Sequence, residues 1–382
     1  MGGDQYGKNL FSRLTIMQKR ILILLPDLNG GGAERLHIQL ANYWHHQGIA
    51  VDFVLMSRRG DLINLVADGV GIIELGATRI RQVVLPLVFY LRKTRPDIFL
   101  VAMWPLTSIA LLAWYIAGKP GRIFLSDHAH LSVACAAETN THPWLLAGAI
   151  ACSYPWAHGI IAVSEGVKQD LCRMGRLSDS QVRVIYNPAA TGVDAHRMLI
   201  PASQKLWGEG FEFHILSVGT LKAQKDHATL IRAFALLPEF LNAKLIILGE
   251  GQLREELEEL IGELQLQNKV EMPGFVIDPS PWFRSADLFV LSSRYEGFGN
   301  VIVEALEFGV PVVSTDCPSG PAEILDHGRY GKLVPVSNHV SLAAAMTASY
   351  FEEHEYTSLL ERAKNFSLER ISAQYLDYFW SK

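Results

Sequence analysis

The sequence predicts an α/β protein with two doubly wound domains that face a central cleft. Three observations support this fold class. The chain has 382 residues, which is long for one hydrophobic core and suits two domains of ordinary size. Short apolar runs alternate with stretches of helical spacing, which is typical of parallel sheets with right-handed crossovers. The alternation stops over residues 189–210 and then restarts, which indicates a linker.

The first series of elements begins near residue 20. Apolar runs predict its strands, and the helical spacing between them predicts its helices. The predicted strands are residues 20–25, 51–56, 98–104, 122–126, 159–163 and 182–185. The predicted helices are residues 33–47, 108–117 and 165–173. We assign residues 14–200 to an N-terminal Rossmann-like domain, and we find no apolar secretory segment in the polar residues 1–13.

One stretch of the first domain imitates a membrane span. Residues 98–117 carry no charge, and their number suffices for a transmembrane helix. Residues 105–108, with the sequence Pro-Leu-Thr-Ser, divide the run into a strand and a helix. Because strands of a parallel sheet are buried on both faces and read as unbroken apolar runs, we favour a buried strand–helix unit over a span.

The second series of elements restarts after the linker. Its predicted strands are residues 213–218, 243–248, 270–272, 288–291 and 310–314. Its predicted helices are residues 226–237, 253–264 and 300–308. We assign residues 201–365 to a C-terminal Rossmann-like domain, and residues 366–382 carry apolar side chains at helical spacing. Ligands of such folds bind at the carboxyl ends of the strands, so the cleft between the domains is the expected site.

Composition and charge exclude several classes of protein. The apolar fraction of 49% describes a folded chain, and the net charge of −5 combines a basic N-terminal half with an acidic C-terminal half. This pattern argues against a nucleic-acid-binding protein, which needs a concentrated basic face. The four cysteines have no CxxC spacing, and we interpret them as free thiols in a reducing, cytoplasmic compartment.

A glycine-containing loop between a predicted strand and a predicted helix is the first chemical signal. It contains Glu296, Gly299 and Asn300, and Glu304 lies one turn inside the helix that follows. A helix N-terminus offers free N–H groups to a phosphate, and the two carboxylates can accept hydrogen bonds from sugar hydroxyls. Taken alone, the loop is equally consistent with a capped helix and a solvated Glu304.

Two further loops at the same predicted cleft strengthen the phosphate hypothesis. Lys225 lies just before a helix in the second domain, where it can pair with a phosphate, although a single lysine is more often a surface residue. In the first domain, residues 29–35 form a glycine-rich turn before a helix. This turn does not match GxGxxG, and no acidic residue ends the second strand, so a dehydrogenase is disfavoured.

Several motifs in this order resemble those of the family-4 retaining glycosyltransferases of GT-B fold, and the resemblance extends from about residue 20 to the C-terminus. The motifs are Gly30-Gly-Gly-Ala-Glu-Arg35, Ser126-Asp-His128, Ala162-Val-Ser-Glu-Gly-Val-Lys168, Val184-Ile-Tyr-Asn-Pro188, Val218-Gly-Thr-Leu221 followed by Gln224-Lys225, Leu248-Gly-Glu-Gly251, Pro273-Gly-Phe275, the segment from Glu296 to Glu304, and Gly320-Pro-Ala-Glu-Ile-Leu325. The resemblance implies that the first domain binds the acceptor, that the second binds the donor, and that the last helix returns to the first domain.

The resemblance also implies a role for each matching residue. Catalytic roles fall to His128, Glu296 and Lys225, which would lie near the transferred sugar and the departing diphosphate. Donor-binding roles fall to Gly31, Gly32, Thr220, Gly274, Phe298, Gly299, Asn300 and Glu304. Glu304 would hold the ribose hydroxyls of the nucleotide. For His128 the alternative is an ordinary loop histidine.

One position departs from the family pattern. The family usually has Arg where this chain has Thr220, and an Arg there would add a second positive charge at the diphosphate. Losing such a contact would cost on the order of 1–3 kcal/mol. Lys222 is close in sequence and is one candidate to compensate. We therefore expect either weaker donor binding or compensation by another group.

The remaining expectations concern the reaction and its partners. The resemblance implies transfer with retention, without a cofactor or metal, from a nucleotide-sugar to a glycan or lipid-linked acceptor in cell-surface polysaccharide, such as lipopolysaccharide, synthesis. Residues 317–321, Cys-Pro-Ser-Gly-Pro, are similar to members that use UDP-sugars. A GT-B sugar-nucleotide epimerase and a non-catalytic sugar-nucleotide-binding protein remain the alternatives.

A basic and apolar segment is the candidate for membrane contact. Residues 79–95 hold five basic side chains and no acidic one around an apolar centre, so they either lie on the inner face of the plasma membrane or form an ordinary amphipathic helix.

Overall fold

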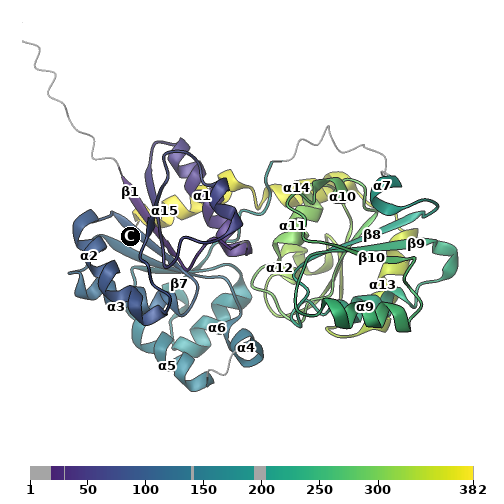
Figure 1. The fold of residues 1–382 in the computed structure, drawn as a ribbon, viewed down its shortest axis with the longest axis horizontal. Helices are drawn as coiled ribbons and strands as arrows, with labels where there is room; N and C mark the ends of the chain where they lie inside the picture. Colours follow the sequence, from purple (N-terminus) through teal and green to yellow (C-terminus); the bar gives the residue numbers. More distant parts are fainter. Residues whose placement is uncertain (1–18, 30, 139–141, 193–203, 382) are drawn as a thin grey trace, which may run out of the picture.

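The computed structural model describes residues 19–29, 31–138, 142–192 and 204–381. Two α/β domains lie side by side, each built around its own parallel sheet (Figure 1). The central part of the predicted linker, including the assigned boundary between residues 200 and 201, lies outside the described residues, as does Gly30.

The first domain contains a seven-stranded parallel sheet in the order β3-β2-β1-β4-β5-β6-β7. The strands are β1 (Arg20–Leu25), β2 (Ala50–Leu55), β3 (Gly71–Glu74), β4 (Ile98–Ala102), β5 (Arg122–Asp127), β6 (Gly159–Ala162) and β7 (Val182–Val184). The helices are α1 (Gly32–His46), α2 (Val84–Thr94), α3 (Leu106–Ile116), α4 (Leu131–Glu138), α5 (Pro143–Ser153) and α6 (Glu165–Gly175). The strand order reverses between β1 and β4, so the loops after these strands diverge to opposite faces and leave a crevice.

The second domain has the same kind of architecture, with a six-stranded parallel sheet in the order β10-β9-β8-β11-β12-β13. The strands are β8 (Phe213–Val218), β9 (Ala243–Leu248), β10 (Val270–Gly274), β11 (Leu288–Leu291), β12 (Val312–Thr315) and β13 (Lys332–Val334). The helices are α7 (Gln204–Trp207), α8 (His227–Phe234), α9 (Arg254–Glu263), α10 (Ser280–Phe283), α11 (Asn300–Glu307), α12 (Pro321–Ile324), α13 (His339–Phe351) and α14 (Tyr356–Lys364). Here the order reverses between β8 and β11, which places a second crevice there.

The C-terminal helix, α15 (Leu368–Ser381), packs on the sheet of the first domain rather than on the second. Its Tyr375 and Phe379 are buried in one core with Trp44 of α1, and the Trp44 indole N–H donates a hydrogen bond of 2.8 Å to Ser372. The yellow helix in Figure 1 accordingly lies beside β1 and α1. The chain therefore crosses between the domains a second time after α14.

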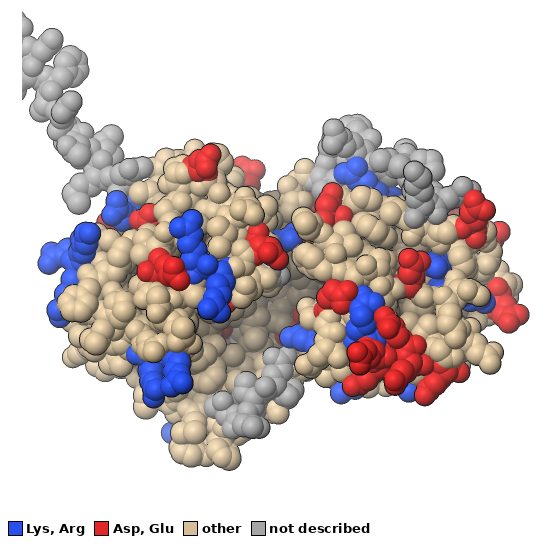
Figure 2. Space-filling model, in the orientation of Figure 1, with Lys and Arg blue, Asp and Glu red and all other residues tan. Residues whose placement is uncertain are grey.

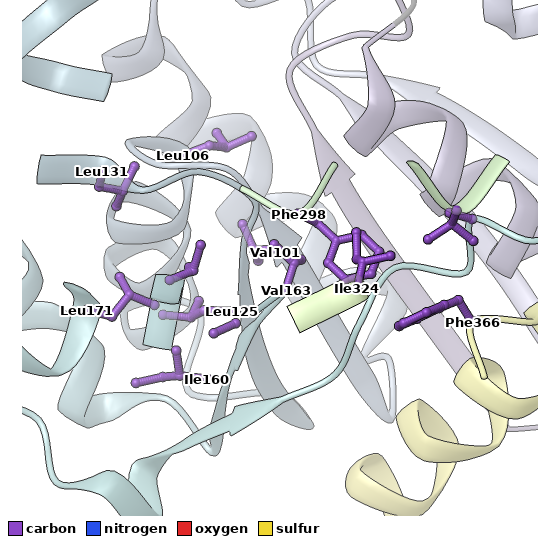
Figure 3. Close-up of a cluster of buried hydrophobic side chains, with 14 of the residues drawn as sticks. Val101, Leu106, Leu125, Leu131, Ile160, Val163, Leu171, Phe298, Ile324 and Phe366 are labelled. Carbon is purple, nitrogen blue, oxygen red and sulfur yellow. The ribbon is translucent and has the colours of Figure 1, made fainter. Parts of the chain in front are cut away.

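A continuous apolar cluster extends from the first domain into the second. Phe298 stacks on Tyr186 with ring centroids 5.5 Å apart and meets the edge of Phe366 at 5.5 Å. Figure 3 shows Phe298 and Ile324 of the second domain lying next to Val163 of the first. This shared core fixes how the loops of the two domains face each other.

The uncharged stretch at residues 98–117 folds as the strand–helix unit that the sequence predicts. All five residues of β4 are buried in the sheet, and α3 follows after a short loop. Within the described part of the chain, no helix combines the length and apolar character that a membrane crossing requires.

Candidate functional site

The site lies where the reversal points of the two sheets face each other. In the first domain, the loop after β1 leads into α1, and His128 directly follows β5. In the second domain, the loops after β8 and β11 flank the reversal point and carry Lys225 and Glu296. Figure 2 shows the hollow between the domains, with charged side chains at its rim.

A pocket of about 210 Å³ occupies the interface between α1 and α11. From the first domain it is lined by Gly32, Arg35 and Gln39, and from the second by Asn300 and Glu304 of α11 together with residues 277–280. Polar groups from both domains thus converge on one concave space, the arrangement expected of a small-molecule site.

Glu304 is one of three acidic residues that line this pocket, with Asp278 and Glu307. It lies on α11 one turn after Asn300, which directs both side chains to the same face of the helix. Burial raises the pKa of Glu304 to about 7, because the charged form is poorly solvated there, and nearby Glu307 raises it further. Arg35 and Lys225 act in the opposite direction. The carboxyl therefore changes charge near neutral pH.

Lys225 and Glu296 form an ion pair that joins the two loops of the second domain. Their Nζ and Oε1 atoms are 2.5 Å apart, and the Ser293 hydroxyl donates to the same carboxylate oxygen at 2.7 Å. Glu296 is only 6% exposed, so the pair is held in a largely dry environment. The structure thus brings together two residues that the sequence places on separate loops of the predicted cleft.

The N-terminus of α11 is formed without a side-chain cap. Gly299 occupies the N-cap position at φ +103°, a conformation that favours glycine, and it has no side chain to cap the first N–H groups of the helix. The Asn300 carboxamide accepts a hydrogen bond of 2.8 Å from Asn187 of the first domain. A Cβ on Gly32 would lie 3.1 Å from the Asn300 Nδ2, so glycine permits this close approach.

His128 faces the second domain from the end of β5. Its Nε2 lies 2.9 Å from the Ser126 hydroxyl, its ring meets that of His37 edge-on at 5.1 Å, and its buried Nδ1 has no partner among the described residues. Burial, with a smaller contribution from His37, lowers the pKa of His128 well below its usual value. A Cβ on Gly297 would collide with the His128 carbonyl oxygen, so the two domains touch here.

Comparison with known proteins agrees with this geometry. The family model described as "Glycosyltransferase Family 4" matches residues 30–193, and "Glycosyl transferases group 1" matches residues 205–366. The two matches together span both domains. The chain belongs to the family-4 glycosyltransferases.

The names of two relatives of this glycosyltransferase mention diphospho-undecaprenol and lipopolysaccharide core biosynthesis. An N-acetylgalactosamine-N,N'-diacetylbacillosaminyl-diphospho-undecaprenol 4-alpha-N-acetylgalactosaminyltransferase from Campylobacter jejuni is 34% identical over 59% of this chain and 60% of its own length. A lipopolysaccharide core biosynthesis glycosyltransferase, LpsE, from Rhizobium meliloti is 28% identical over 92% of this chain and 96% of its own. A glycosyltransferase from Methanocaldococcus jannaschii at 35% identity is matched over 47% of its length, so the chain spans only about half of that relative.

Solved structures support the fold. HepE from Anabaena, in complex with UDP and glucose, superposes with a TM-score of 0.79 at 21% identity, covering 96% of this chain and all of that one. A lipopolysaccharide outer core galactosyltransferase, WaaB, superposes with a TM-score of 0.73 at 20% identity, covering 95% of this chain and 99% of that one. The fold of this glycosyltransferase is therefore GT-B.

Not every predicted site residue of this glycosyltransferase lines the pocket. Thr220 is exposed at the end of β8. Gly274 ends β10 at φ +102° next to the Glu250 side chain, before the segment that lines the pocket. Gly31 is the N-cap of α1, and a Cβ there would collide with Glu34. These three positions shape the loops around the pocket rather than its walls.

The structure adds residues that the sequence interpretation did not single out as site residues. Arg35, within a quoted motif, lies one helical turn after Gly32 and lines the pocket. Asp278 approaches from the loop after β10, and His37 packs against His128. The i, i+3 spacing of Gly32 and Arg35 on one helix face was the available signal for Arg35.

Proposed function

We propose that this protein transfers a hexose or N-acetylhexosamine from a UDP-sugar to a glycan or lipid-linked acceptor, with retention of the anomeric configuration. The observation that carries the proposal is the pocket between α1 and α11, where a carboxylate from one domain faces glycine and arginine from the other. Relatives named for lipid-linked and lipopolysaccharide acceptors favour a role in cell-surface glycan synthesis.

The donor fits the pocket with its nucleotide towards Glu304. In this proposal the Glu304 carboxylate accepts hydrogen bonds from the ribose hydroxyls, and the free N–H groups at Gly299 and Asn300 meet the diphosphate. Lys225, held beside Glu296, neutralises charge on the leaving phosphate. Glu296 has a second oxygen available for a hydroxyl of the donor sugar. Gly31 and Gly32 allow the loop of the first domain to close over the phosphates.

The reaction requires little covalent chemistry from the protein. The bond between the anomeric carbon and the diphosphate oxygen breaks, the acceptor oxygen bonds to that carbon on the same face, and the acceptor proton passes to the departing phosphate. Catalysis is then mainly positioning and stabilisation of the leaving charge, for which Lys225 and the helix N-terminus suffice without a metal ion. The neutral His128 ring offers its unpartnered Nδ1 to a hydroxyl of the transferred sugar.

A nucleotide screen followed by a transfer assay tests the donor. We expect UDP to raise the melting temperature more than GDP or ADP, because stabilisation grows with the ratio of ligand concentration to Kd. Transfer is then measured with UDP-N-acetylglucosamine, UDP-N-acetylgalactosamine and UDP-galactose on bacterial lipid extracts. Glu304→Ala should abolish both the rise in melting temperature with UDP and the transfer of sugar. Glu263→Ala on the exposed face of α9 should abolish neither. Unchanged binding and transfer in Glu304→Ala would refute the proposal.

Two alternatives give different results in the same experiments. An epimerase would interconvert the UDP-sugar in the absence of acceptor. A non-catalytic binding protein, suggested by the neutral Thr220, would bind UDP tightly and transfer nothing to any extract. Retention is read from the anomeric proton coupling of the product.

The acceptor side of the first domain fits an anionic membrane surface. Helix α3 packs against both α2 and α5, and all three helices carry large exposed apolar side chains. These side chains are Leu85, Phe89, Leu112, Tyr115, Ile116, Trp144 and Leu145. Between residues 79 and 137 the acidic residues are Asp97 and the buried Asp127, whereas basic residues are frequent, and Figure 2 shows no red over α3 and α5. We propose that this face contacts the inner leaflet, where lipid-linked acceptors are reached.

Vesicle sedimentation tests the membrane face. We expect the protein to bind vesicles that contain phosphatidylglycerol and to lose binding in Phe89→Ser/Trp144→Ser, because both rings are 68% exposed. Phe240→Ser is the matched control, since that ring is 66% exposed on the second domain. Equal loss in the control, or no binding by the wild type, would contradict this contact.

A further inference from the structure

Arg35 is a positively charged residue of the pocket wall that forms no ion pair within the described part of the chain. It lies in the first turn of α1, is half-buried and lines the pocket. Within the described residues, no carboxylate lies within 4.0 Å of its guanidinium, and no hydrogen bond engages it. Most buried or half-buried arginines are paired, so an unpaired one that faces a cavity indicates a missing anionic partner.

The position of Arg35 is set by the packing of α1 against α11. Gly32 faces Asn300, and one turn along both helices Arg35 faces Glu304. Arg35 affects the pKa of Glu304 more than Lys225 does, so it is the nearer cation in electrostatic terms. The group that binds between Arg35 and Asn300 therefore lies beside the ribose site and next to the N-terminus of α11.

The other charged residues that line the pocket are acidic and offer no positive charge to a phosphate, and Lys225 does not line it. Asp278 and Glu304 are acidic, and the Glu307 carboxylate already accepts hydrogen bonds from the backbone of Thr191 and Gly192. Lys225 is paired with Glu296 in the neighbouring loop. Among the residues that line the pocket, Arg35 alone carries a positive charge.

We propose that Arg35 binds the phosphate next to the ribose of the nucleotide-sugar and supplies, from the first domain, the positive charge that Thr220 does not supply. The inference rests on the proposed donor. A planar guanidinium matches two phosphate oxygens and is always charged, so it stabilises the leaving diphosphate as the bond to the sugar breaks. Because Arg35 belongs to the first domain and Glu304 to the second, the nucleotide bridges the domains.

Calorimetric titration with UDP and with uridine tests the inference. Arg35→Gln should weaken UDP binding by about 10- to 150-fold, the range for a charge-assisted hydrogen bond, and should leave uridine binding unchanged. Arg35→Lys keeps the charge but not the planar fork, so it should lose less than Arg35→Gln. The control is Arg232→Gln, which removes an exposed arginine from α8. Equal loss of UDP and uridine binding, or no loss of either, would overturn the role of Arg35.

A second variant tests whether Arg35 replaces the usual arginine at position 220. Thr220→Arg introduced into Arg35→Gln should restore most of the lost UDP affinity and of the transfer rate. If it restores neither, the two positions do not bind the same diphosphate, and the proposal that Arg35 compensates for Thr220 is wrong. Wild-type protein that binds no UDP would instead overturn the proposed donor, so the two failures are distinguishable.

Discussion

Replacing Glu304 with Gln should stabilise the nucleotide-free protein above neutral pH while it damages the proposed donor site. Burial raises the pKa of Glu304 from 4.5 to about 7. A carboxyl with a raised folded-state pKa is most stabilising below its unfolded value, and that stability is lost as the pH rises through the folded value. The wild type therefore loses free energy of unfolding between about pH 4.5 and 7 as Glu304 ionises. The Gln variant has no carboxyl at this position and does not show this loss.

The size of the effect follows from the same pKa change. Each pKa unit corresponds to about 1.4 kcal/mol, so ionising Glu304 in the folded state costs about 3–4 kcal/mol. One kcal/mol moves the melting temperature of a domain of this size by about 2–4 °C. We expect Glu304→Gln to melt several degrees above the wild type at pH 8 and at the same temperature near pH 4.5.

Differential scanning fluorimetry from pH 4.5 to 8 measures this difference, because other titrating groups are common to both proteins and cancel. Adding UDP should reverse the order at pH 8, since the charged carboxylate binds ribose hydroxyls more strongly than an amide does. Glu263→Gln on α9 is the control for losing one exposed carboxylate. The reasoning would be refuted if the difference in melting temperature did not vary with pH. It would also be refuted if the nucleotide-free wild type melted at a higher temperature than Glu304→Gln at pH 8.

Three further predictions concern the loops and the leaving group. Lys225→Ala leaves the buried Glu296 without its partner at 2.5 Å, and the transfer rate should fall about 100- to 1,000-fold; a rate near that of the wild type would contradict the role. Gly297→Ala places a Cβ against the His128 carbonyl, so nucleotide affinity should fall in calorimetry, whereas Gly148→Ala, with open space around it, should leave the affinity unchanged. EDTA should not reduce transfer, and a loss that Mn²⁺ restores would show that a metal is needed.

The strands were predictable where burial is complete. β1, β4 and β9 are almost entirely buried, and such strands read as apolar runs whose length identifies them. β3 and β13 were not predicted, since their short segments are only partly buried and carry polar residues. Helices α5 and α13 were missed for a related reason. Their own residues are apolar or small on every face, so their sequences show no clear helical periodicity.

The site was predictable loop by loop but not across the cleft. Glycines and charged residues beside a strand end indicated the segments around Lys225 and Glu296, and the structure joins them. Arg35 could not be assigned in this way, because its importance depends on α11, which is distant in sequence. Local patterns identify what a loop can bind, whereas long-range packing decides which groups share a pocket.

Two hydrogen bonds between the domains come from the same segments that carry the proposed donor groups. Ser164 donates to the Gly297 carbonyl at 2.7 Å, within the loop that holds Glu296. Glu307, on the helix of Glu304, accepts from the backbone of the chain near Thr191 at 2.9 Å.

A third contact between the domains involves Glu323. Glu323 accepts hydrogen bonds of 2.7 and 3.1 Å from the backbone N–H groups of Glu165 and Gly166, so a carboxylate of the second domain satisfies the N-terminus of α6 in the first. Separating the domains would expose this helix end and leave Glu323 without its donors. A nucleotide bound between Arg35 and Glu304 would add to these contacts, so donor binding and domain closure should stabilise each other.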